Sequence, residues 1–149
     1  MKSFKEAIAF AIRHEEREAA FYTNLAERSE SEDQRQALLA RAGEEQEHKA
    51  RLIAVQDQGQ VPESKVIPDA DMKLAETLEV VPDPDQPISY EEALILGAKR
   101  EKAAEQLYRD LASRVESGPL KETLSWLADQ EAAHGADMER AYDDALKEG

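Results

Sequence analysis

An internal duplication constrains this chain more than any other feature. Residues 5–57 align with residues 91–143 without a gap, so every equivalent pair lies 86 positions apart. Each copy contains a lone glutamate, then a tyrosine, then a Glu-x-x-His unit, with the same spacings in both copies. These residues are Glu15, Tyr22 and Glu45-Gln46-Glu47-His48 in the first copy, and Glu101, Tyr108 and Glu131-Ala132-Ala133-His134 in the second. A repeated pattern of this length predicts two halves with the same local structure.

Helical periodicity surrounds these residues. Apolar side chains recur at steps of three and four, as on the buried face of an amphipathic helix, and the glutamates and histidines fall in the same stripe. Serines that can cap a helix open two of the segments, in Ser3-x-x-Glu6 and Ser89-x-x-Glu92. The pattern predicts helices from Ser3 to about Arg28, from Gln34 to about Gln56, from Ser89 past Leu111, and from Pro119 to about Leu146.

The connections between the segments indicate how the helices are arranged. Short polar or Gly-Pro turns predict two antiparallel helical hairpins, residues 3–56 and 89–146. Residues 57–88 contain five prolines and are long enough to be a crossover along the bundle. We therefore expect residues 1–149 to form a single all-α domain, a four-helix bundle of two duplicated hairpins.

Composition excludes several classes of function. The net charge of −14 argues against nucleic acid or an anionic membrane as a partner. The chain has no cysteine, which excludes disulfides, iron–sulfur clusters and thiolate metal sites. The longest apolar run near the N-terminus, Ala7–Ile12, is too short for a signal peptide or a membrane span. We expect a cytoplasmic protein.

The acidic residues in the apolar stripes predict a metal centre. An ionised carboxylate is costly to bury unless something pairs with it, and Glu and His three residues apart on a helix can bind one ion. Four helices around one axis would bring together four carboxylates and two imidazoles. The four negative charges of the carboxylates would balance two divalent ions, and each ion would gain one nitrogen ligand. The nitrogen ligands suit iron or manganese better than magnesium or calcium. The predicted ligands are Glu15, Glu45, His48, Glu101, Glu131 and His134.

Four other residues lie near these ligands in the helical pattern. Glu18 lies in the same stripe as Glu15, one turn later. Tyr22 and Tyr108 lie two turns beyond the lone glutamates; their hydroxyls either donate to a ligand carboxylate or simply belong to the core. His14 lies off the stripe and can pair with Glu18 at i+4, so we predict a surface histidine.

The sequence resembles the rubrerythrin family of ferritin-like proteins over essentially its whole length. The motifs that carry the resemblance are Ala11–Glu15 with Phe21-Tyr22, Glu45–His48, Ala93–Tyr108 and Glu131–His134. The resemblance implies a di-iron centre in a ferritin-like four-helix bundle, usually in a homodimer. It also implies an oxidoreductase that reduces hydrogen peroxide, with a role in oxidative stress, or one that oxidises ferrous iron.

Two differences from the family modify this expectation. Full rubrerythrins carry a cysteine-rich rubredoxin domain that relays electrons; this chain, which has no cysteine, is expected to use a separate electron-donor protein. Rubrerythrins also carry an extra glutamate one turn after the ligand glutamate of the third helix, where this sequence has Ala104. The equivalent position in the first copy is Glu18, which makes Glu18 a candidate seventh ligand.

Three functions therefore compete. The favoured one is a peroxidase-like di-iron oxidoreductase that takes electrons from a separate donor. The second is a ferroxidase or iron-binding protein for iron handling, with oxygen or peroxide as the oxidant. The third is a metal-free structural bundle. Manganese in place of iron remains open, because the same ligands suit both ions.

Overall fold

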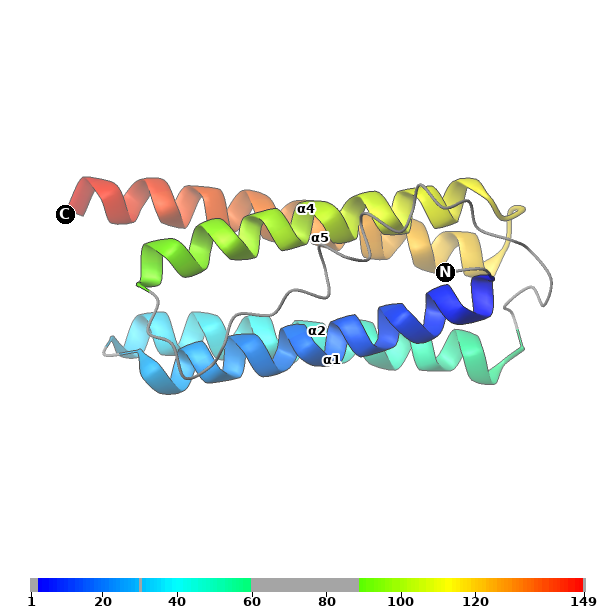
Figure 1. Ribbon diagram of the computed structural model, residues 1–149, viewed down its shortest axis with the longest axis horizontal. Helices are drawn as coiled ribbons and strands as arrows, with labels where there is room; N and C mark the ends of the chain where they lie inside the picture. Colours follow the sequence, from blue (N-terminus) through cyan, green and yellow to red (C-terminus); the bar gives the residue numbers. More distant parts are fainter. Residues whose placement is uncertain (1–2, 30, 60–88, 149) are drawn as a thin grey trace. The chain divides into compact units, whose positions relative to one another are not determined.

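The computed structural model describes residues 3–29, 31–59 and 89–148, and the regular secondary structure of these residues is entirely α-helical. The elements are α1 (Phe4–Arg28), α2 (Glu32–Asp57), α4 (Tyr90–Ser113) and α5 (Pro119–Glu148) (Figure 1). Each of the four predicted helices is confirmed. Helices α1 and α2 belong to one compact unit, and α4 and α5 belong to another. The predicted crossover lies outside the described residues from residue 60 to residue 88.

Serine side chains begin three of the helices. The hydroxyls of Ser3 and Ser89 each accept the backbone N–H three residues later, at 3.2 and 3.0 Å, as both capping patterns predict. Ser31 Oγ accepts the N–H of Gln34 at 3.3 Å, so α2 begins at Glu32, two residues before the predicted start. A capping serine of this kind stabilises a helix by about 1 kcal/mol. The local sequence thus determines where these helices start.

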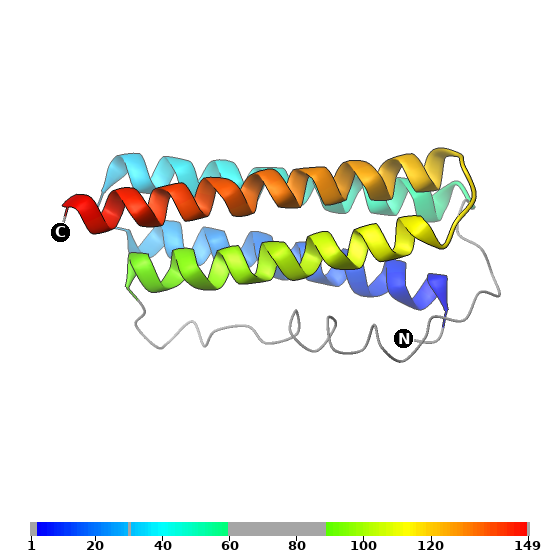
Figure 2. The ribbon, with the colours of Figure 1, turned by 90° about the horizontal axis from the view of Figure 1, so that it is seen from above.

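Short turns make each helix pair antiparallel (Figure 2). Only residues 29–31 lie between the end of α1 at Arg28 and the start of α2 at Glu32. Between α4 and α5, Gly118 has a φ of +154°, a backbone conformation that residues with a Cβ rarely adopt. Pro119 follows as the first residue of α5, a position at which its missing N–H has no intrahelical partner to lose.

The buried face of each helix carries large aliphatic and aromatic side chains. Side chains that are less than 2% exposed include Ile8 and Tyr22 on α1, Leu52 on α2, Leu107, Tyr108 and Leu111 on α4, and Leu124 and Leu127 on α5. Burying one such side chain contributes about 1.5–3 kcal/mol. Acids and histidines interrupt these faces near their middle, and these polar residues form the candidate site.

Candidate metal centre

The α1–α2 hairpin brings three of the predicted ligands together. Nδ1 of His48 lies 3.4 Å from Oε2 of Glu15 on the neighbouring helix and 3.4 Å from Oε2 of Glu45 on its own helix. One ligand atom from each of these residues lies within 4.8 Å of the other two. All three side chains are buried, with at most 1% exposed. We refer to Glu15, Glu45 and His48 as the first half-site.

The α4–α5 hairpin repeats this arrangement. Nδ1 of His134 lies 3.9 Å from Oε2 of Glu101 on the neighbouring helix. Glu131 offers a carboxylate oxygen within 4.8 Å of a ligand atom from each of those two residues. The three residues are between 1% and 4% exposed. We refer to Glu101, Glu131 and His134 as the second half-site.

The distance of each glutamate from the hairpin turn explains why the residues meet. Glu15 lies as far before the end of α1 at Arg28 as Glu45 lies after the start of α2 at Glu32. Because both helices rise about 1.5 Å per residue, these equal separations place the two glutamates at the same height.

The second hairpin follows the same rule. Glu101 lies as far before the end of α4 at Ser113 as Glu131 lies after the start of α5 at Pro119. In both Glu-x-x-His units the histidine follows on the same helix face, one turn later. In each hairpin, the spacing between the lone and the paired glutamate therefore places the two residues at one height.

The donor atoms of each half-site fit a transition-metal ion. Ligand atoms on one divalent ion, with bonds of about 2.0–2.2 Å and angles of about 90–110°, lie about 2.8–3.6 Å apart. The two 3.4 Å separations around His48 fall in this range, and the 3.9 Å separation of His134 from Glu101 is slightly longer. Two carboxylates supply negative charge, and one imidazole supplies the nitrogen ligand that iron and manganese accept.

The prediction that His14 lies at the surface is wrong. Its side chain is 1% exposed, and its Nδ1 lies 3.8 Å from Oε1 of Glu18, which is also buried. The i+4 pairing is therefore present, but in the interior. Helix α1 buries Phe10 and Phe21 as well, on the same side as His14 and beside the stripe through Glu15 and Glu18. The buried face of α1 is thus wider than the single stripe from which the prediction was made.

Both tyrosines of the repeated pattern lie in the interior. Tyr22 is 1% exposed and Tyr108 is 0% exposed. The ring of Tyr22 packs edge-on against that of Phe21, with the centroids 5.2 Å apart and the planes at 65°. This burial agrees with a core role and leaves hydrogen bonding to a ligand carboxylate as a prediction.

A buried arginine next to the second half-site was not predicted from the sequence. Arg100 directly precedes Glu101 on α4, and only 2% of it is exposed. In the duplication Arg100 is equivalent to His14, which directly precedes Glu15. The signal that could have found both is this equivalence, because a basic residue occupies the same place in each copy. Both hairpins therefore bury a basic side chain next to the lone glutamate.

The sequence pattern of the Rubrerythrin family matches residues 6–142, nearly the whole chain. The chain belongs to the rubrerythrin family. A search of curated proteins and a search of solved structures each give no significant match. Family membership and the four helices together make the fold of this rubrerythrin-family chain the all-α, ferritin-like four-helix bundle predicted from the sequence.

Membership also defines the general chemistry. A rubrerythrin-family chain is a di-iron carboxylate protein of the oxidoreductase type, and both half-sites offer the carboxylate and imidazole donors that such a protein needs. Among the described helices of this rubrerythrin-family chain, none combines the length and the apolar character required to span a lipid bilayer.

Proposed function

We propose that this chain reduces hydrogen peroxide at a di-iron centre whose ligands come from both half-sites. The observation that carries the proposal is the repetition of one buried donor set, two carboxylates and one imidazole, in each hairpin. Two such sets supply four carboxylates and two imidazoles, the ligand complement of ferritin-like di-iron proteins. The proposed ligands are Glu15, Glu45, His48, Glu101, Glu131 and His134.

The buried carboxylates are suited to hold two ferrous ions. Four ionised carboxylates carry four negative charges, which balance two divalent cations, and burial strengthens the attraction because little water screens it. When held by these carboxylates and imidazoles, two ferrous ions would supply the two electrons that, with two protons, reduce one hydrogen peroxide to two waters. The apolar side chains around the half-sites limit the access of bulk water. Manganese fits the same donors, so metal analysis must accompany the activity assay.

Glu18 is the proposed seventh ligand. It is 2% exposed and lies one turn after Glu15, while the equivalent residue of the second hairpin is the fully buried Ala104. A further carboxylate beside the first half-site would offset the positive charge gained when iron is oxidised. Tyr22 and Tyr108 are proposed as hydrogen-bond donors to ligand carboxylates, supported by their burial and their equivalent places in the two copies.

The proposed reaction requires an external source of electrons. The printed sequence has no cysteine, so it contains no thiolate-bound iron centre that could return electrons to the di-iron site. We propose that a separate donor protein supplies them. We also propose that the chain assembles as a homodimer, as its family membership favours.

The test is metal analysis followed by stopped-flow oxidation. We expect about two iron ions per chain, and an anaerobic ferrous form that oxidises much faster with hydrogen peroxide than with oxygen. If oxygen oxidised the ferrous form as fast as peroxide, and added ferrous iron continued to turn over, iron handling would be favoured instead. The net charge of −14 would assist iron handling by attracting cations. A protein that takes up no metal on reconstitution would overturn the proposal.

A further inference from the structure

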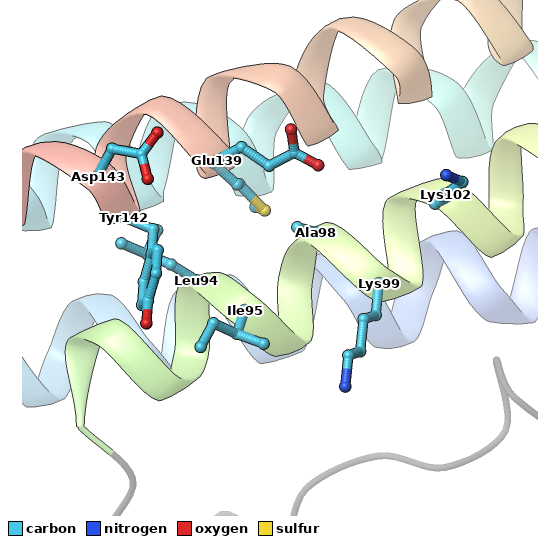
Figure 3. A pocket seen from close by; sticks show the side chains of 9 residues that line it. Leu94, Ile95, Ala98, Lys99, Lys102, Glu139, Tyr142 and Asp143 are labelled. Atoms are coloured by element: carbon cyan, nitrogen blue, oxygen red, sulfur yellow. The ribbon is translucent and has the colours of Figure 1, made fainter.

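A groove runs between α4 and α5, and the proposed chemistry does not use it (Figure 3). Its volume is about 390 Å³. Leu94 and Ala98 of α4 and Met138 of α5 form an apolar floor. The groove lies within one hairpin.

Two lining residues of this groove differ in size or polarity from their equivalents in the first hairpin. Its lining residues Ala98 and Glu139 are equivalent to Ile12 and Ile53 of the first hairpin. Both isoleucines are half-buried. Replacing a half-buried isoleucine by alanine in one place and by an exposed glutamate in the other removes apolar volume from the space between the helices. The second hairpin therefore has less apolar side-chain volume between its helices at this position than the first hairpin has.

The second hairpin also lacks an ion pair that joins the two helices at the equivalent position of the first hairpin. In the first hairpin, Lys49 Nζ lies 2.9 Å from Glu16 Oε1 and links α2 to α1. The equivalent residues are Gly135 and Lys102, which cannot form such a pair. A Cβ added at Gly135 would lie 3.6 Å from Cβ of Glu101, an ordinary contact, so the small residue is not required by close packing. The second hairpin therefore lacks this link beside the groove, which Lys102 lines.

Large apolar side chains are exposed along the same face. Ile95 lines the groove and is 39% exposed, and Leu146, one turn beyond the lining residue Tyr142, is 57% exposed. In the described part of the chain, one further large hydrophobic residue is exposed, Leu39 on α2 at 40%. Exposed apolar side chains that continue a groove mark an interaction surface.

The charges on the two rims are segregated by helix. Lys99 and Lys102 lie on α4, whereas Glu139 and Asp143 lie on α5, and all four side chains are exposed (Figure 3). A uniformly acidic or basic partner would be repelled by one rim. A second copy of the same face, related by a two-fold axis along the helices, would instead place each lysine rim over an acidic rim. An isologous contact requires this kind of self-complementarity.

The size of the face suits a stable dimer. Helix α4 has 24 residues and is therefore about 36 Å long. Two packed helices are about 20 Å wide, so the face covers about 700 Å² in projection, close to the roughly 800 Å² that each partner buries in a standard interface. We infer that the α4–α5 groove is the interface between two copies of this chain. The inference deepens the proposed homodimer and does not depend on which oxidant the metal centre uses.

Sedimentation of the iron-loaded full chain tests the inference. We expect a dimer for the unaltered chain and at least about tenfold weaker dimerisation for Ile95→Glu, because the new charge would be desolvated at the interface. The matched control is Leu39→Glu, at an equally exposed leucine on α2, which should remain dimeric. Iron per chain should be the same in all three, so a failure of the metal proposal is seen separately. A monomeric unaltered chain, or an Ile95→Glu dimer as tight as the Leu39→Glu dimer, would overturn the inference.

Charge reversal identifies the partner. Lys99→Glu with Lys102→Glu should give a monomer with two acidic rims, and Glu139→Lys with Asp143→Lys a monomer with two basic rims. An equimolar mixture of these variants should form heterodimers, which also shows that both are folded. If each variant alone stays dimeric, or if the mixture stays monomeric while both variants keep native helical circular dichroism, the groove is not a contact between two copies.

Discussion

Nδ1 of His48 and Oε2 of Glu15 lie 3.4 Å apart, on the two neighbouring helices of one hairpin. The contact exists because the hairpin turn sets Glu15 level with Glu45, and His48 follows Glu45 one turn later on the same face of α2. In the second copy, Nδ1 of His134 lies 3.9 Å from Oε2 of Glu101 in the same relationship. The duplication has therefore preserved one buried contact between an imidazole and a carboxylate in each hairpin, and this contact can be tested in each copy separately.

Replacing either histidine by alanine should weaken metal binding. His48→Ala and His134→Ala each remove the nitrogen donor of one half-site. Loss of a residue that only supports a ligand lowers metal affinity by roughly 10–100-fold, so loss of a ligand itself should lower it by at least that much. The measurement is iron per chain after reconstitution and desalting. Glu16→Gln is the control, since Glu16 is exposed next to Glu15. Full iron occupancy in both histidine variants would contradict the assignment.

Glu18→Ala should slow the oxidation of the ferrous form by peroxide by about tenfold if Glu18 is a seventh ligand. Stopped-flow absorbance of the ferric product measures this rate, and metal analysis of the same sample separates slower chemistry from lost iron. Glu47→Ala removes an exposed carboxylate from α2 and should leave both quantities unchanged. If Glu18→Ala retained both the iron content and the oxidation rate of the unaltered chain, Glu18 would be a structural residue and not a ligand.

The sequence predicted the helices better than the burial of individual residues. Capping serines and the Gly118-Pro119 turn are local signals, so the starts of α1, α4 and α5 could be located within one residue. Burial is a property of packing: the stripe through Glu15 could not show that α1 buries a second line of residues including His14. Arg100 was missed for the same reason, since a charged residue off the stripe is exposed by default. The ligand assignments and the single-domain arrangement stay predictions.

Tyr22→Phe and Tyr108→Phe test whether the buried hydroxyls act on the metal centre. Each substitution keeps the ring and removes one hydroxyl, so a pure core role predicts a loss of stability of about 0.5–1.5 kcal/mol with an unchanged oxidation rate. Donation to a ligand carboxylate predicts, in addition, a shifted absorption spectrum of the ferric form. Thermal unfolding and the spectrum of the same samples distinguish the two roles. An unshifted spectrum in both variants would count against donation.

Removing the metal should destabilise the protein, and a single charge substitution should partly reverse that loss. Free iron at about 1,000 times its dissociation constant stabilises the folded state by about 4 kcal/mol, which corresponds to a fall in Tm of about 8–16 °C when iron is removed. Without metal, Glu15 and Glu45 place carboxylate oxygens within 4.8 Å of each other, where like charges repel. Glu45→Gln should therefore raise the Tm of the metal-free protein while lowering that of the iron-loaded protein. Calorimetry of both forms measures these opposite shifts, and a fall in Tm in both would show that Glu45 stabilises the fold independently of metal.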